Sequence, residues 1–195
     1  GVRCGNGGLW KLDLNNSSHR WCVYGDYEGS NQMDWLRSWL QVGGHIVDSG
    51  ANIGQMTLYF APLPGVFLHS FEPTSVAGNW LVDCVNANGF QNVRVVHRGL
   101  SCTTERVPIQ LDEARSTLRL DWYGDAKLKR EVIELILLDD YLAEQQVSRV
   151  RVWKLDVEGH ELQALMGAKN SLLSGMIDAI LIEVSESTFE DLKRF

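Results

Sequence analysis

A carboxylate stands beside a glycine-rich turn in the first half of the chain, in the stretch from Asp48 to Gly54 that reads DSGANIG. The apolar run at residues 45–47 precedes this turn and an apolar-periodic segment at 53–60 follows it, which predicts a strand, a turn and the start of a helix. Backbone amides point outward at such a helix start, and glycine lets a ligand approach the backbone. Asp48 would repel a pyrophosphate and attract an ammonium or sulfonium group, so the turn favours a methyl donor over a dinucleotide.

A second acidic residue, Glu72, comes 24 positions after Asp48, directly behind the apolar run at 66–71. An acidic side chain at the end of the second strand, about 20 residues past a glycine turn, can accept hydrogen bonds from both hydroxyls of a ribose. Pro73 follows Glu72, and Ser101 comes shortly after a third expected strand at 93–97. Residues at that strand end often contact the base ring of a bound nucleotide or nucleoside.

A second stretch with side chains that could do chemistry spans residues 150–161 and reads VRVWKLDVEGHE. We interpret it as a strand that ends near Asp156, turns at a glycine and enters a helix. Lys154 and Asp156 share a face of the strand because side chains alternate along it. A lysine in an otherwise apolar strand is costly unless it is paired, so we expect a carboxylate partner for Lys154, with Asp139 and Asp140 as candidates.

The elements that would position these residues alternate between strands and helices, which is typical of a mostly parallel α/β sheet with helices on both faces. The remaining patterns predict helices at 31–42 and 75–86, a hairpin of strands at 107–111 and 131–136, a helix from Asp139 and a fifth strand at 178–182 that ends in Glu183.

The first 30 residues contain two short alternating runs, 10–14 and 21–24, on either side of a turn-forming cluster. They predict a β-hairpin that covers the core or acts as a substrate flap. We therefore expect an N-terminal hairpin and helix at 1–42 that pack on a ligand-binding domain at 43–195. The substrate pocket would be built from the N-terminal segment and the region 103–138, where no diagnostic motif occurs.

The composition of the chain limits the classes of partner that it could bind. Of its 195 residues 45% are hydrophobic and 22% are charged, as in an ordinary soluble globular domain. The net charge of −7 argues against a nucleic-acid partner, which would need a basic face. No apolar run approaches the roughly 20 residues of a membrane span, and we expect a cytoplasmic protein. The four cysteines show neither CxxC spacing nor a Cys/His cluster, so no zinc site is indicated, and a Cys4–Cys22 disulfide stays open.

Five motifs, in order between residues 43 and 186, resemble those of the FkbM family of S-adenosylmethionine-dependent methyltransferases. The stretch from Lys154 to Glu161 is the most family-specific of them. The motifs are Asp48 to Gly54, Phe71-Glu72-Pro73, Leu138-Asp139-Asp140, Lys154 to Glu161 and Ile182-Glu183.

The resemblance implies a Rossmann-like class I methyltransferase fold and methyl transfer to a hydroxyl oxygen, often of a saccharide, glycolipid or natural product. It places Asp48, Gly50, Ala51, Asn52 and Gly54 around the methionine part of S-adenosylmethionine. Glu72 and Pro73 would hold the ribose and Ser101 would lie near the adenine. The fold normally continues with a helix and an antiparallel strand pair after the fifth strand, and this pair is apparently missing. The open sheet edge would then be covered by the N-terminal hairpin or by a second copy of the chain.

Methyl transfer from a sulfonium to a hydroxyl is an in-line displacement that needs near-attack geometry and a base for the hydroxyl proton. Asp156, Glu158 and His160 are the catalytic candidates because they follow the central fourth strand at its carboxyl end. Asp156 is the leading one, as base or as orienter of the acceptor. His160, near a helix start, should tend toward neutrality and so suits a base, unless it is only a surface residue of the first helical turn. Glu158 and Glu161 could likewise only stabilise the helix start.

Three alternatives stay open. Asp156, Glu158 and Glu183 could converge on one hard cation, but carboxylates at adjacent strand ends are common without a metal, and we expect none. A nucleotide-dependent oxidoreductase is disfavoured because the turn lacks a GxGxxG pattern and carries Asp48 where a pyrophosphate would lie. A non-catalytic module that binds the cofactor is the third, since a fold does not determine a function.

Overall fold

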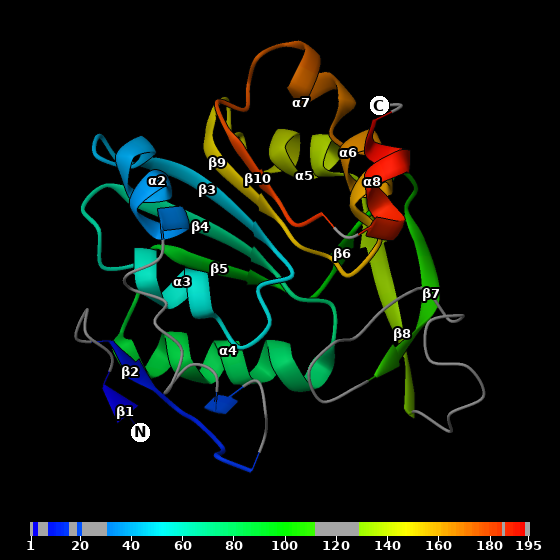
Figure 1. Cartoon of the computed structure of the whole chain (residues 1–195). Coiled ribbons are helices and arrows are strands. Elements are labelled where there is room, and N and C mark those ends of the chain that lie inside the picture. The colour runs from blue at the N-terminus through cyan, green and yellow to red at the C-terminus, as the bar shows by residue number, and fades with distance from the viewer. Residues whose placement is uncertain are drawn as a thin grey trace.

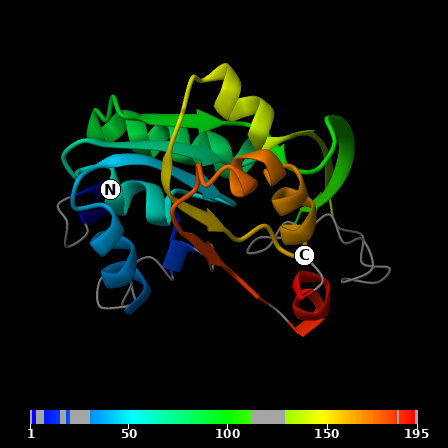
Figure 2. The ribbon, with the colours of Figure 1, turned by 90° about the horizontal axis from the view of Figure 1, so that it is seen from above.

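The computed structural model describes residues 2–3, 8–15, 19–20, 31–111, 129–184 and 186–193, and its centre is a parallel sheet between two layers of helices (Figure 1; Figure 2). The strands follow the apolar runs of the sequence and pair in the order β10-β9-β3-β4-β5. They are β3 Gly44–Ser49, β4 Val66–Phe71, β5 Val93–Val96, β9 Val150–Leu155 and β10 Ile180–Ile182. Every pair in this sheet is parallel, so the residues that follow β3, β4 and β9 meet at one edge.

Alternation of side chains along the strands assigns the helices to the two faces. One face presents Ile46 and Leu68 to α2 Asn31–Trp39 and α3 Gln55–Phe60, and α4 Ser75–Asn88 packs beside them (Figure 1). The other presents Val47 and Trp153 to α5 Leu138–Glu144, α6 Glu161–Met166 and α7 Lys169–Leu173. The predicted sheet with helices on both faces is confirmed. None of the helices in the described part of the chain has the length and apolar character that crossing a membrane requires.

The first of these helices ends earlier than predicted. The pattern indicated a helix over 31–42, whereas α2 ends at Trp39. The amide of Leu40 donates to the carbonyl oxygen of Arg37 and the amide of Gly43 to that of Leu40, so three-residue bonds tighten the chain into a turn. The apolar stripe behaves as expected, because Met33, Leu36 and Leu40 are buried against the sheet.

A smaller sheet extends from the end of β5. Its strands are β6 Gly99–Leu100, β7 Glu105–Leu111 and β8 Lys129–Ile136, in the order β6-β8-β7. β7 and β8 are antiparallel, with Val107 opposite Ile133, which confirms the predicted hairpin. Residues 112–128, where we predicted a polar loop, lie outside the described residues.

The first predicted strand of the N-terminal hairpin is shorter than expected, because β2 covers only Leu9–Trp10 and pairs with β1 Val2–Arg3. The second predicted strand, at 21–24, lies outside the described residues, as do Cys4 and Cys22. The side chain of Asn88 on α4 accepts a hydrogen bond from the amide of Leu9 and donates one to its carbonyl oxygen. The segment therefore packs along α4.

The chain leaves the sheet after β10. α8 Glu186–Leu192 follows and contacts α6. Within the described residues β10 is the last strand of the sheet, and its three side chains are partly exposed.

A buried histidine lies between the sheet and α5. His69 Nδ1 lies 2.9 Å from the Tyr141 hydroxyl, and His69 Nε2 lies 3.0 Å from His45 Nδ1. Burial, together with smaller contributions from the charges of His45 and Arg94, lowers the pKa of His69 from 6.5 to about 4. Burial also raises the pKa of Tyr141 to about 12, so the hydroxyl keeps its proton and can donate it to His69.

We predict that this histidine makes the protein less stable in acid. Between pH 6.5 and about 4 the unfolded chain takes up a proton at this position and the folded chain does not, so stability falls as the pH falls. The shift is worth about 3 kcal/mol below pH 4. Urea unfolding of His69→Gln should show a lower free energy of unfolding at pH 7 and a weaker fall toward pH 4. An unchanged slope would contradict this assignment.

Candidate active site

The glycine turn joins the end of β3 to the start of α3. Gly50, Asn52 and Gly54 have positive φ angles of 74°, 49° and 97°. The amides of Gly50 and Ala51 both donate to the carbonyl oxygen of Phe71, at 3.0 and 2.9 Å. The turn is therefore tied to the end of β4, next to Glu72.

The glycines leave room for the protein's own chain. A Cβ atom on Gly50 would lie 1.8 Å from the carbonyl oxygen of Asp156, and one on Gly54 would lie 2.4 Å from Leu81 Cδ1. Gly50 thereby brings the turn after β3 into backbone contact with the turn after β9, and Gly54 lets α3 and α4 pack closely.

Asp48 is fully buried beneath the turn. Its Oδ2 accepts a hydrogen bond from Thr57 Oγ1 at 2.7 Å, and its Oδ1 lies 3.6 Å from Lys154 Nζ, an ion pair longer than a hydrogen bond. Lys154 Nζ also donates to the carbonyl oxygen of Gly50 at 2.9 Å and lies 3.3 Å from Asp156 Oδ2. The lysine thus links the glycine turn to the turn after β9.

The prediction that Lys154 has a carboxylate partner is confirmed, but the partners are Asp48 and Asp156 rather than Asp139 or Asp140. Asp48 lies directly opposite Lys154 in the register of β3 and β9, which places both side chains on one face of the sheet. Asp139 instead binds the start of α7, where its carboxylate accepts from the amides of Asn170 and Ser171 at 2.8 and 2.9 Å.

Glu72 lies at the end of β4 with its carboxylate held from two sides. Oε2 accepts from the amide of Asn52 at 3.0 Å, and Oε1 accepts from the amide and the hydroxyl of Thr74 at 3.0 and 2.5 Å. Burial raises the pKa of Glu72, opposed by the hydrogen bonds from Thr74 and Asn52 and by the charge of Lys154. Three of about four acceptor positions on the carboxylate are used, so capacity for a further donor remains.

The turn after β9 has a strained backbone that a buried glutamate holds. Glu158 has a φ of 52°, a left-handed conformation that is unusual for a residue other than glycine. Glu161 is 2% exposed, and its Oε1 accepts from the amides of Val157 and Gly159, both at 3.1 Å. Glu161 therefore stabilises the turn itself, and the interpretation that it only favours the helix start is too narrow.

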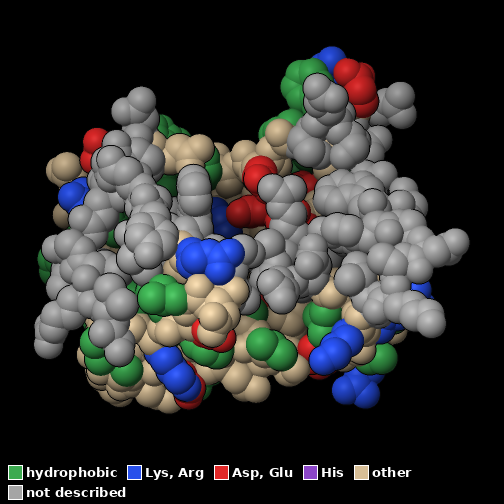
Figure 3. Space-filling model, turned by 60° about the horizontal axis from the view of Figure 1, so that its bottom comes forward, with side chains coloured by type: hydrophobic (Ala, Val, Ile, Leu, Met, Phe, Trp, Pro, Cys, Tyr) green, Lys and Arg blue, Asp and Glu red, His purple; other side chains and the backbone are tan. Residues whose placement is uncertain are grey.

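Three carboxylates come together at the ends of β9 and β10. Oxygen atoms of Asp156, Glu158 and Glu183 lie within 4.8 Å of one another. Lys154 Nζ, 3.3 Å from Asp156, already supplies a positive charge at this cluster. Figure 3 shows acidic side chains around a hollow in the face that it presents. The arrangement suits the orientation of a hydroxyl group, because carboxylates accept hydrogen bonds.

The hydrogen-bond partner of His160 lies outside this acidic cluster. Its Nε2 is 3.0 Å from Ser101 Oγ, and Ser101 is buried. Burial lowers the pKa of His160, while the charge of Glu105 acts in the opposite direction. The three catalytic candidates are therefore divided between an acidic cluster with Asp156 and Glu158 and a serine–histidine pair.

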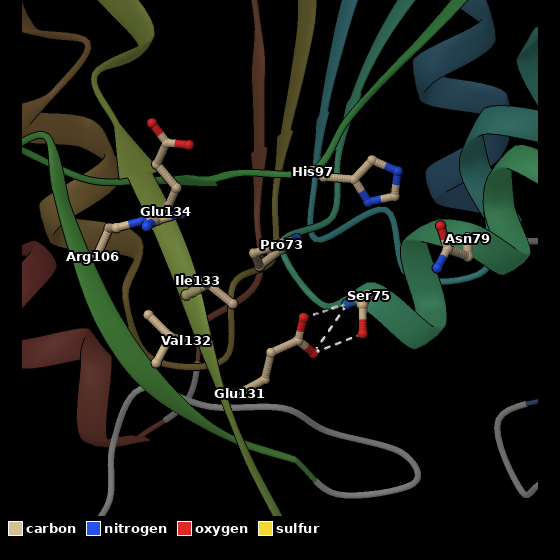
Figure 4. Close-up of a pocket in the computed structure, with 9 residues that line it drawn as sticks. All are labelled: Pro73, Ser75, Asn79, His97, Arg106, Glu131, Val132, Ile133 and Glu134. Carbon is tan, nitrogen blue, oxygen red and sulfur yellow. Dashed lines mark hydrogen bonds between the residues drawn. The ribbon is translucent and has the colours of Figure 1, made fainter.

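A pocket of about 330 Å³ opens beside Pro73, between the start of α4 and the hairpin of β7 and β8 (Figure 4). Glu131 crosses one end of it, since its carboxylate accepts from the amide of Ser75 at 3.0 and 3.1 Å and from the Ser75 hydroxyl at 3.1 Å. The walls are formed by Pro73, Ser75, Asn79, His97, Arg106 and residues 131–134. The pocket is thus built partly from the region 103–138, where we expected substrate contacts.

Two residues that support the site were not identified in the sequence. Thr57 binds Asp48, and its presence among the apolar residues of α3 was an available signal, because a buried hydroxyl requires a partner. Thr74 binds Glu72 and carries no such signal, since threonine is common directly before a helix.

A family model described as the methyltransferase FkbM domain matches residues 48–195, which is 148 of the 195 residues. The chain belongs to this family. The match begins at Asp48 and contains the glycine turn, Glu72 and the turn after β9, so the resemblance drawn from these motifs is confirmed. The family to which the chain belongs is one of methyltransferases.

Solved structures give the FkbM chain the same fold. It is similar to the METTL16 MTase domain, with a TM-score of 0.58 and 14% identity over 98% of this chain and 64% of that one. It is also similar to the human methyltransferase 10 domain containing protein, with a TM-score of 0.54 and 12% identity over 98% of this chain and 76% of that one. A third, the N-terminal domain of human METTL16, has a TM-score of 0.51 and 14% identity over 84% of this chain and 58% of that one.

At these identities the similarity concerns the fold alone, and it confirms the Rossmann-like methyltransferase architecture. The FkbM chain spans less than two thirds of the METTL16 MTase domain. A comparison with curated protein sequences finds no match.

Proposed function

We propose that this FkbM chain transfers a methyl group from S-adenosylmethionine to a hydroxyl oxygen of a small acceptor, such as a saccharide, a glycolipid or a natural product. The observation that carries the proposal is the position of Glu72 beside the glycine turn, with the cluster of Asp156, Glu158 and Glu183 at neighbouring strand ends. Bound S-adenosylmethionine supplies an electrophilic methyl group.

The cofactor side is formed by the turn and by the end of β4. The remaining acceptor capacity of Glu72 fits a ribose hydroxyl, and its bond to the Asn52 amide connects the ribose position to the turn. Pro73 lies beside the ribose. The residues that we place around the methionine part are Gly50, Ala51, Asn52 and Gly54, with Asp48 acting from beneath through Lys154.

The acceptor side is formed by the cluster at the ends of β9 and β10. Asp156 and Glu158 orient the acceptor hydroxyl, because their carboxylates accept hydrogen bonds and their oxygen atoms lie close together at the ends of β9 and β10. The negative charge of the cluster also favours a cationic sulfonium over the neutral product thioether, which assists product release.

We predict that Glu72→Gln weakens cofactor binding. A hydrogen bond to a charged group contributes about 1.5–3 kcal/mol, so the Kd for S-adenosylhomocysteine should rise by about tenfold to a hundredfold. Isothermal titration with the full chain measures this. Glu131→Gln is the matched control, because Glu131 binds the start of α4 and should leave the Kd within about twofold. Absence of binding by the unaltered chain, or preference for NAD, would contradict the proposal.

Turnover is tested with labelled S-adenosylmethionine and a panel of saccharides, glycolipids, polyketide-type alcohols and structured RNA. Label in a hydroxyl-bearing small molecule supports the proposal, and label in RNA overturns the acceptor class. Cofactor binding without transfer to any of them favours a non-catalytic module. The reaction should survive exhaustive chelation, since Lys154 supplies the positive charge at the acidic cluster.

A further inference from the structure

The imidazole ring of His160 is held by a buried serine. Ser101 Oγ lies 3.0 Å from His160 Nε2, and Ser101 is 2% exposed. The Ser101 amide donates to the carbonyl oxygen of Ile136 at 2.9 Å. A Cβ atom on Gly167 would lie 1.9 Å from the Ser101 carbonyl oxygen, so α6 ends directly against this residue. The backbone of Ser101 is therefore held on one side by a hydrogen bond and packed on the other against the end of α6.

The backbone that carries His160 is fixed as well. His160 directly follows the turn that Glu161 holds through the amides of Val157 and Gly159. The carbonyl oxygen of His160 accepts from the amide of Ala164 in the first turn of α6. Both partners of the Ser101–His160 pair therefore have a defined position before any ligand binds.

A neutral imidazole has one protonated nitrogen and one with a free lone pair. Burial keeps His160 neutral at pH 7 by lowering its pKa. Because Nε2 is engaged by Ser101, Nδ1 is the nitrogen that can exchange a proton with a ligand. It can accept one only when Nε2 carries the hydrogen and donates it to Ser101 Oγ.

We propose that Ser101 is a positioning residue that accepts a hydrogen bond from His160 Nε2 and thereby keeps Nδ1 free to act as the general base. The inference rests on the proposed function. In the transfer the acceptor oxygen bonds to the methyl carbon, the carbon–sulfur bond breaks with its electron pair left on sulfur, and the hydroxyl proton moves to Nδ1. The imidazolium then releases this proton to solvent. This role replaces the adenine contact expected for Ser101.

The test reads the tautomer of His160 directly, in the full chain with ¹⁵N-labelled histidine. The five histidines are distinguished by loss of one signal in His160→Gln. We expect a single tautomer protonated at Nε2, a mixture of tautomers in Ser101→Ala, and return of the single tautomer in Ser101→Thr, which restores a hydroxyl. Ser171→Ala is the matched control, because it removes a buried hydroxyl that binds Asp139 and should leave the His160 signal unchanged.

Binding of S-adenosylhomocysteine separates this inference from the proposed function. Ser101→Ala should bind it within about twofold of the unaltered chain. A loss of about tenfold or more would show that Ser101 contacts the cofactor and would overturn the inference, as would a His160 protonated at Nδ1 or a tautomer unaffected by Ser101→Ala. Failure of the unaltered chain to bind S-adenosylhomocysteine contradicts the proposed function instead, and the tautomer result remains readable in that case.

Discussion

Replacing Gly50 with alanine is expected to lower the free energy of unfolding by at least about 3 kcal/mol and to abolish measurable binding of S-adenosylhomocysteine. The backbone of Gly50 has a φ of 74°, which costs an alanine about 1–2 kcal/mol. The new Cβ would also lie 1.8 Å from the Asp156 carbonyl oxygen, and backbone cannot rotate away as a side chain can. The turns after β3 and β9 would have to separate, which moves both halves of the proposed site.

Gly89→Ala is the matched control for this change. Gly89 follows α4 with a φ of 67°, and nothing lies within 4 Å of the position of its Cβ atom. Gly89→Ala therefore has the conformational cost of a positive φ angle but no steric clash at its Cβ. We expect its free energy of unfolding to fall by about 1 kcal/mol, with unchanged ligand binding. Urea unfolding and titration calorimetry on both variants give the difference. Equal losses would show that the Gly50 contact does not hold the two turns together.

Lys154→Met is expected to lower the free energy of unfolding by about 3–5 kcal/mol, because it leaves the carboxylate of Asp48 buried without a positive partner. The other oxygen of Asp48 binds the Thr57 hydroxyl, which does not neutralise the charge. Adding Asp48→Asn removes the charge and keeps an acceptor for Thr57. The double variant should therefore recover more than half of the lost stability, measured by urea unfolding at pH 7.

The double variant should still bind S-adenosylhomocysteine poorly. Lys154 Nζ donates to the Gly50 carbonyl oxygen at 2.9 Å, and methionine cannot replace that bond to the glycine turn. Lys193→Met is the control for loss of a lysine from an ion pair at the surface, where its exposed contact with Glu190 is worth less than about 1 kcal/mol. If the double variant were no more stable than Lys154→Met alone, the buried pair would not explain the effect.

Much of the fold could be predicted from the sequence because its signals are local. Alternation over 107–111 and 131–136 indicated the hairpin of β7 and β8, and apolar runs indicated the parallel strands. The glycine turn was recognised from the spacing of Gly50 and Gly54, both of which have positive φ angles in the structure. Each of these features depends on neighbouring residues, whose steric and hydrophobic preferences act within a few positions.

Contacts between distant residues could not be predicted in the same way. Asp48 and Lys154 are opposite each other because of the register of β3 and β9. The sequence of either strand alone does not specify that register. Leu9 of the N-terminal segment binds Asn88 of α4, 79 residues away, and no local pattern indicates this contact. Side-chain partners of this kind depend on how whole elements are placed, so Asp139 was assigned to a lysine although it binds the start of α7.

The sequence by itself determined which residues are candidates for the chemistry, because Asp48, Glu72, Asp156, Glu158 and His160 are marked by glycine turns and strand ends that local physics can identify. Only the tertiary structure decided which of these candidates lie together. It buries Asp48 against Lys154, leaves Glu72 beside the glycine turn, and groups Asp156 and Glu158 with Glu183. It also joins His160 to Ser101, 59 residues away. The physical reason is that hydrogen bonds and ion pairs are formed in three dimensions, between groups that sheet order and register bring within about 3 Å.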